Sequence, residues 1–66
     1  MCEANVYLTN DNDSREELLL EAVDLVEPLE ADQWRLVSIF GEQKVVRAKI
    51  KRMVLAEHKI FLEPVG

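Results

Sequence analysis

Several residue types are scarce in this sequence. It contains one cysteine, one histidine, two glycines and two prolines in 66 residues. A single cysteine excludes an intramolecular disulfide, and glycines only at positions 41 and 66 leave no glycine-rich loop for a phosphate. No apolar run approaches the roughly 18 residues that a membrane-spanning helix needs. These absences exclude disulfide scaffolds, P-loop enzymes and helical membrane proteins.

The residue types that carry catalysis are too few to form a recognisable active site. Besides the lone histidine and cysteine, the chain has one tyrosine and three hydroxyl-bearing residues, Thr9, Ser14 and Ser38. Neither a Cys-x-x-Cys nor a His-x-x-x-His spacing is present. We therefore expect no enzyme activity.

The charge balance is acidic, with a formal net charge of −5. Binding to nucleic acid depends on neutralising phosphates with Lys and Arg, so this balance argues against nucleic acid as the main partner. A cation or a basic protein surface fits the chain better.

Length and composition indicate one small globular domain, residues 1–66. Hydrophobic residues make up 48% and charged residues 32% of the chain, as in ordinary folded proteins. A domain of this size buries only roughly 60% of its unfolded surface, so its core is marginal and oligomerisation is the expected support. We predict a homodimer. The N-terminus has no basic and apolar leader, which predicts a cytoplasmic protein.

The first strand is predicted close to the N-terminus, because apolar and polar residues alternate there with a period of two. Its expected buried face comprises Cys2, Ala4, Val6 and Leu8, and Thr9 falls on the opposite face. A polar loop over residues 10–14 should end this strand, since short polar side chains bond their own backbone in turns.

Three further strands are expected in the second half of the chain, which is rich in β-branched and aromatic residues. They comprise residues 34–40, the segment from residue 44 onward, and residues 60–62. Gly41 should form a tight turn, since a residue without Cβ can adopt a positive φ angle. We expect Ser38 on the polar face, and the following on the buried faces: Trp34, Leu36 or Val37, Ile39, Val46, Ala48 and Ile50.

The stretch from Glu16 to Leu29 is ambiguous. Leu18, Ala22 and Leu25 fall at helical spacing, and propensity alone favours a helix. We nevertheless predict two short extended pieces, residues 17–20 and 23–27, because Pro28 disfavours helical geometry at the preceding residue.

The strands and turns together predict the fold class. Five or six short antiparallel strands, with turns every eight to twelve residues, are typical of small all-β domains. We predict an up-and-down meander that closes into a small SH3-like barrel.

Cys2 is the residue whose local chemistry is most informative. Methionine before a small residue is commonly removed, which would leave Cys2 at the N-terminus with both a thiolate and a free α-amine. The deprotonated amide nitrogen of Glu3 would add a third donor. Sulfur and nitrogen donors in one plane suit Ni(II) or Cu(II).

Residue chemistry alone leaves a second reading of Cys2 open, as a small hydrophobe at the start of the buried face. His58 is a further candidate ligand. It stands between Glu57 and Lys59 in a predicted turn, where a solvated histidine is the commoner outcome.

A basic strand face offers an alternative function. Arg47, Lys49 and Lys51 alternate with the apolar residues of one strand and could meet an acidic protein or an RNA backbone. Such a stripe is more often a solvated strand face, and no aromatic residue interleaves with it to stack bases. This alternative is a small RNA-binding or protein-interaction module.

Four stretches of the sequence resemble the CooT family of short nickel-binding proteins. They are Met1 to Ala4, Leu20 to Pro28, Leu36 to Lys44 and Ile50 to Leu62. Together they cover nearly the whole chain, and Cys2 directly follows the initial methionine, as in the family.

The resemblance implies an SH3-like homodimer whose N-terminal cysteine binds nickel for the active cluster of carbon monoxide dehydrogenase. It favours ligation by Cys2 over packing. The predicted metal site is therefore Cys2 and Glu3 holding Ni(II), with Glu3 contributing its main-chain nitrogen. The expected partner is carbon monoxide dehydrogenase or another nickel accessory protein.

Overall fold

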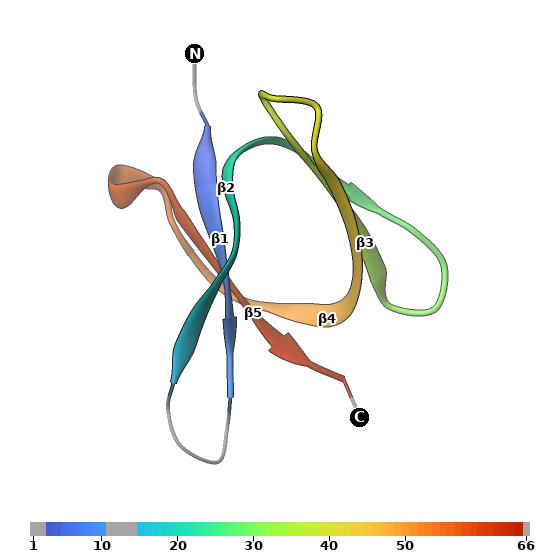
Figure 1. The fold of residues 1–66 in the computed structure, drawn as a ribbon. Coiled ribbons are helices and arrows are strands. Elements are labelled where there is room, and N and C mark those ends of the chain that lie inside the picture. Colours follow the sequence, from blue (N-terminus) through green and yellow to red (C-terminus); the bar gives the residue numbers. More distant parts are fainter. Residues whose placement is uncertain (1–2, 11–14, 66) are drawn as a thin grey trace.

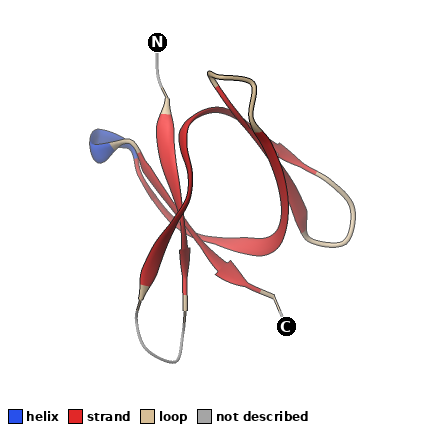
Figure 2. Ribbon diagram, viewed as in Figure 1, coloured by secondary structure: helices blue, strands red, loops and turns tan. Residues whose placement is uncertain are grey.

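The structure is a computed structural model that describes residues 3–10 and 15–65. Its strands are β1 (Ala4–Thr9), β2 (Glu16–Pro28), β3 (Gln33–Ser38), β4 (Gln43–Val54) and β5 (Lys59–Pro64), and the 3-10 helix η1 (Leu55–Glu57) separates the last two (Figure 1). Apart from that single helical turn, the described chain consists of strands and loops (Figure 2). Beyond Asn10, the predicted loop over residues 10–14 lies outside the described residues.

The five strands form one closed barrel. Each strand pairs antiparallel with the next along the chain, and β1 also pairs in parallel with β5. An up-and-down chain with an odd number of strands ends in the direction in which it began, so the pair that closes the barrel has to be parallel. The predicted all-β class and small barrel are confirmed, with the addition of this parallel pair.

Strand β2 takes part in two pairings and bends between them. It pairs with β1 as far as Val23 and with β3 from Val23 onward, with register shifts on both sides. Ala22 lies at this bend in the left-handed region, with φ 55°. Its amide donates to Asn5 Oδ1 at 3.1 Å, and its carbonyl accepts from the Ile39 amide at 2.8 Å. The two predicted extended pieces are therefore the two arms of one strand.

The core lies inside the barrel. Val6, Leu36 and Leu62 are fully buried at its centre, one from each of β1, β3 and β5. On β4, Ala48 is buried and Val46 and Ile50 pack against the same cluster, as predicted. The alternating residues Arg47, Lys49 and Lys51 are exposed. The buried cluster consists of Val6, Leu20, Val23, Leu36, Ala48, Ile60 and Leu62.

Three side chains lie on the opposite side from the one predicted. Thr9 and Ser38 were expected outside, yet they are only 4% and 3% exposed. Each hydroxyl has hydrogen bonds that offset its burial. Thr9 donates to the Leu62 carbonyl at 3.1 Å, and Ser38 Oγ accepts from the backbone amides of Phe40 and Glu42, each at 3.2 Å. Ile39 follows the inward-facing Ser38 and is 41% exposed, so its predicted burial is wrong.

The turn between β3 and β4 has the predicted glycine in the left-handed region. Gly41 has φ 86°, and its amide donates to the Ser38 carbonyl at 3.0 Å. Phe40 stands at the tip of this turn with 76% of its surface exposed. Hydrogen bonds to the backbone and the hydroxyl of Ser38 therefore hold the turn while the Phe40 side chain stays exposed.

Truncation of a central core residue should destabilise the barrel strongly. We expect Leu36→Ala to lower the free energy of unfolding by about 2–5 kcal/mol, because a cavity remains where the side chain was. Leu55→Ala is the control, since Leu55 is 76% exposed and its truncation should change stability by less than about 0.5 kcal/mol. Urea unfolding measures both values, and equal losses would contradict this assignment of the core.

Two exposed alanines provide a test of backbone strain. Ala31 has φ 59° in the turn before β3, whereas Ala56 lies in η1 and has no positive φ. Ala31→Gly should raise the free energy of unfolding by about 0.5–1 kcal/mol. Alanine pays a steric cost in the left-handed region that glycine does not pay, and this cost is larger than the backbone entropy that glycine loses on folding. Ala56→Gly should lower stability by about 0.5–1 kcal/mol. Thermal unfolding of both variants measures the difference, and the same sign in both would contradict this account.

Candidate metal centre

The two residues predicted to hold the metal stand at the start of the chain. Cys2 lies outside the described residues. Glu3 is described, is exposed, and directly precedes β1. Glu3 is the first described residue, so its surroundings are the part of the candidate site that the structure describes.

The start of β1 is fixed by one hydrogen bond to the residue that precedes β5 and one from β2. The Asn5 amide donates to the His58 carbonyl at 2.9 Å, and Asn5 Oδ1 accepts from the Ala22 amide at 3.1 Å. Asn5 also stands opposite Lys59 in the parallel β1–β5 register. The barrel therefore brings the lone histidine, which is 55 positions further along the chain than Glu3, to the side of β1.

A pocket of about 220 Å³ opens at this end of the barrel. Three residues with potential metal-binding side chains line it, Glu3, Asp24 and His58, and Lys59 lines it as well. The remaining wall is apolar. It consists of Ala4, Val23, Val26, Leu55 and Ile60. We call this hollow the N-terminal pocket.

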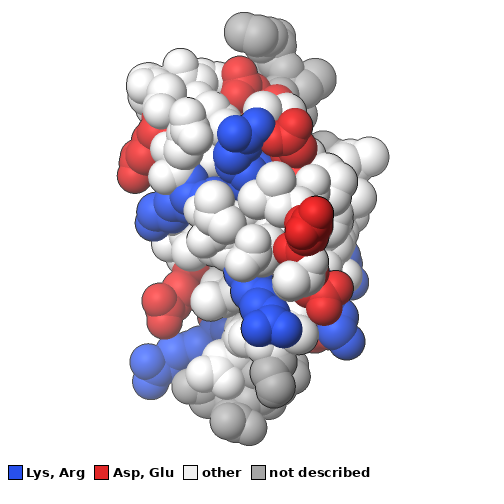
Figure 3. All heavy atoms as spheres, turned by 90° about the vertical axis from the view of Figure 1, so that its right-hand side faces the viewer, with Lys and Arg blue, Asp and Glu red and all other residues white. Residues whose placement is uncertain are grey.

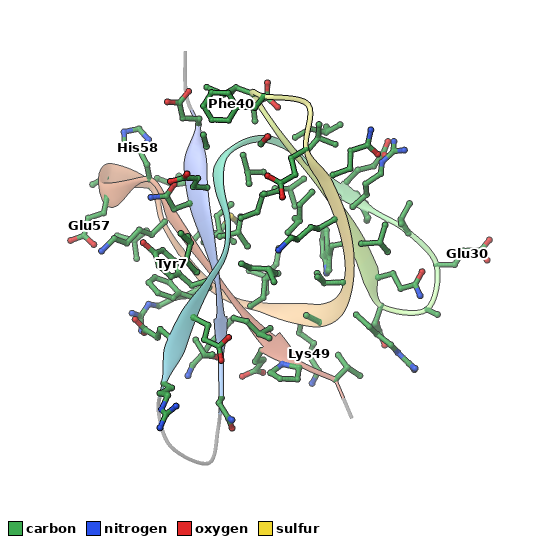
Figure 4. The ribbon with its side chains drawn as sticks, in the orientation of Figure 1. Tyr7, Glu30, Phe40, Lys49, Glu57 and His58 are labelled. Carbon is green, nitrogen blue, oxygen red and sulfur yellow. The ribbon has the colours of Figure 1, made fainter. Side chains whose placement is uncertain are left out.

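His58 takes an unusual backbone conformation beside this pocket. It ends η1 with φ 55° and ψ 48°, in the left-handed region, and its amide donates to the Leu55 carbonyl at 3.2 Å. The predicted turn is therefore present, and the imidazole is exposed. Figure 4 shows His58 at the same end of the barrel as the start of β1, with Phe40 at that end as well.

The described residues do not complete a metal site among themselves. In residues 3–10 and 15–65, no group of three His, Cys, Asp or Glu side chains is close enough to hold an ion. Lys59 also brings a positive charge to the N-terminal pocket, and its ammonium lies 3.8 Å from Glu57 Oε1. The described residues at this end therefore offer single potential ligands and a nearby positive charge.

The basic strand face is present, but a carboxylate on the neighbouring strand partly offsets its positive charge. Arg47, Lys49 and Lys51 are exposed along β4. Lys49 stands opposite Glu63 of β5 in the register, so a carboxylate adjoins the middle of the stripe. This arrangement is typical of a solvated strand face.

An aromatic cluster on the outside of the barrel was not predicted. The rings of Tyr7 and Phe61 are stacked with centroids 5.3 Å apart, and the Arg52 guanidinium lies 4.3 Å from the Phe61 centroid. Phe61 is only 4% exposed although it lies outside the core cluster. The three consecutive apolar residues 60–62 are a signal for this cluster in the sequence. Successive side chains of a strand point to opposite faces, so one of the three has to lie on the outer face.

Sequence reasoning also missed two lining residues of the N-terminal pocket, Asp24 and Lys59. Asp24 comes to the pocket because β2 bends at Ala22, and Lys59 because β5 pairs in parallel with β1. Neither feature has a periodic signal in the sequence.

In the part of the chain that the structure describes, no helix has the length and apolar character needed to span a membrane.

Comparisons with known proteins give a consistent result over almost the full chain. The family described as CO dehydrogenase accessory protein CooT matches residues 1–63. A crystal structure described as that of a putative CooT from Carboxydothermus hydrogenoformans is 45% identical, with a TM-score of 0.87 and coverage of 98% of this chain and 100% of that chain. An uncharacterised protein of Methanocaldococcus jannaschii is 35% identical over 63 residues, which are 96% of this chain and 98% of the relative. The chain therefore belongs to the CooT family of CO dehydrogenase accessory proteins.

Proposed function

We propose that this protein is a nickel-binding accessory protein, a metallochaperone that holds Ni(II) through Cys2 for the maturation of carbon monoxide dehydrogenase. The observation that carries the proposal is the family match from residue 1 to residue 63, which includes Cys2 and Glu3. Ni(II) is the cargo of this protein, so the proposal includes no catalytic step.

The proposed ligand set comes from one end of the chain. Once the initial methionine is removed, Cys2 presents its thiolate and its α-amine, which chelate one ion in a five-membered ring. The main-chain nitrogen of Glu3 adds a third donor after it loses its proton. Such a planar set of sulfur and nitrogen donors suits Ni(II), whose d electrons favour square-planar coordination.

The barrel supports this site by holding the start of β1 in place. Asn5, only two residues after Glu3, is hydrogen-bonded to the carbonyl of His58, which precedes β5, and to the Ala22 amide of β2. The carboxylates of Glu3 and Asp24 line the N-terminal pocket and attract a dication. The exposed imidazole of His58 lines the same pocket, although the proposed three donors do not require it.

The proposal includes a homodimer and a client. A chain of 66 residues has a marginal core, and a second copy adds buried surface. The proposed recipient of the nickel is carbon monoxide dehydrogenase or another accessory protein of its maturation. The acidic net charge of −5 and the position of Glu63 opposite Lys49 favour this role over RNA binding by the basic strand face.

Removal of the thiolate should abolish tight nickel binding. We expect saturable binding with thiolate-to-nickel charge-transfer bands for the reduced wild-type protein, and loss of those bands in Cys2→Ser. Titration with Ni(II), followed by ultraviolet-visible spectroscopy, measures both. Equal binding by the two proteins, or by neither, would return Cys2 to the core and refute the proposed site.

Two variants of Glu3 separate the main-chain donor from the side chain. Glu3→Gln keeps the amide proton and should bind nickel nearly as the wild type does. Glu3→Pro has no amide proton to lose, so it should weaken binding by at least about tenfold. Glu3 precedes β1, so proline there breaks no hydrogen bond of the strand ladder. Equal affinities of the two variants would exclude the main-chain nitrogen as a ligand.

Nickel affinity should fall as the pH falls. The thiol and the α-ammonium have ordinary pKa values near 8.5 and near 8, so both are mostly protonated at pH 6 and must lose their protons to bind. Below pH 7 the affinity should therefore drop by more than about tenfold per pH unit, because at least two protons are released per ion. Titration at pH 6, 7 and 8 in a non-coordinating buffer measures this slope. A pH-independent affinity would contradict thiolate and amine ligation.

A further inference from the structure

One outer face of the barrel combines apolar side chains with a balanced pair of charges. Two rows of side chains cross β2, β3 and β4 on the side away from the core, because their chain neighbours Val26 and Leu36 point inward. One row is Leu25, Val37 and Gln43, and the other is Glu27, Arg35 and Val45. We call these six residues the β2–β3–β4 face. Figure 3 looks onto this side of the molecule, where charged side chains of both signs interrupt uncharged surface.

The apolar members of this face are well exposed. Leu25 is 43% and Val45 is 57% exposed, and both extend from strands whose other side packs in the core. The two most exposed large hydrophobics, Phe40 and Leu55, stand in a turn and in η1 and not on a strand. Val37 of β3 is half-buried beside Leu25, so the β2–β3–β4 face presents apolar side chains from three adjacent strands.

We infer that the β2–β3–β4 face is the surface through which two copies of this chain associate. The inference rests on the homodimer of the proposed function and assigns its interface. At the centre of this face β3 is paired on both sides, with β2 and with β4, so it offers no free edge there onto which another strand could add. Association through this face therefore uses side chains, and a second copy supplies the matching apolar surface.

The charges of the face favour a second copy as the occupant. Each chain carries −5, so two copies repel one another over most of their surface. On this face Arg35 forms an ion pair with Glu27, which cancels the charge locally. In a twofold arrangement each protomer offers both signs to its partner, so Arg35 of one can approach Glu27 of the other. A face with this property is self-complementary.

The face also adjoins the end of the barrel where β1 begins. Ala4 is the register partner of Val23, and Leu25 is two residues further along β2. An interface here therefore starts beside the chain segment that continues from Cys2 and Glu3.

A pair of matched substitutions tests the location. Val45→Asp places a charge on the face, whereas Met53→Asp places the same charge on the distal half of β4, where Met53 is 54% exposed. We expect Val45→Asp to raise the dissociation constant of the dimer by at least about tenfold and Met53→Asp to leave it nearly unchanged. Sedimentation equilibrium without nickel measures both constants, and circular dichroism checks that each variant is folded. Equal dimerisation of the two variants would overturn the inference.

A mixing experiment tests the charges across the interface. Glu27→Arg gives the face two positive charges, and Arg35→Glu gives it two negative charges, so each variant alone should dimerise at least about tenfold more weakly. An equimolar mixture should recover the affinity of the wild type, because each protomer then meets the opposite charge. Loss of dimers that mixing does not restore would show that the substitutions act within one chain, and would overturn the inference.

Failure of this inference and failure of the nickel proposal are distinguishable. A wild-type chain that stays monomeric at millimolar concentration, with and without nickel, refutes the homodimer and this face together. The charge-transfer bands of the nickel titration report on Cys2 independently of the oligomeric state. Bands in the wild type together with a monomer would therefore keep the metal site and remove only the interface.

Discussion

The hydrogen-bonded seam between β1 and β5 is the constraint on which the rest of this structure depends. It joins the two ends of the chain and is fixed at both of its own ends. The Asn5 amide donates to the His58 carbonyl, and the buried hydroxyl of Thr9 donates to the Leu62 carbonyl. Without the seam, β1 and β5 would each have an open edge. Because its partners are 53 positions apart, this closure costs more loop entropy than a hairpin does and joins the first described strand to the last.

The N-terminal pocket is a consequence of that seam. Its lining comes from the start of β1, from β2 just beyond the bend, from η1 and from β5. Ala22 adopts a left-handed backbone conformation, and the bend that results lets β2 pair first with β1 and then with β3. The same bend brings Asp24 to the pocket that Glu3 also lines. Barrel closure and the composition of the pocket are therefore set by the same few backbone contacts, although the pocket residues are far apart in the sequence.

Local periodicity was sufficient to predict β1, β3 and β4, because alternation records which side of a strand is buried. For β2 the spacing also fitted a helix, and Pro28 decided the prediction. Periodicity predicted the inward Val46, Ala48 and Ile50 and the turn at Gly41. It failed for Thr9 and Ser38, since their burial depends on hydrogen bonds to distant or turn backbone that hydropathy does not report. The candidate metal residues Cys2 and Glu3 came from terminal chemistry and family resemblance. The pocket around Glu3 could not be predicted, because it requires the parallel register of β1 with β5.

The charge of the chain links the two proposals in a way that the local contacts do not. A Ni(II) ion that displaces one proton each from a thiol, an ammonium and an amide leaves the protomer one unit more negative. Loading with nickel therefore cannot relieve the repulsion between two chains that each carry −5. A stable dimer then needs a surface where the charge is already balanced and where apolar area is buried. The β2–β3–β4 face meets both requirements. The Glu27–Arg35 pair offers both signs to a partner and adds no net charge, and the exposed side chains of Leu25 and Val45 supply apolar area.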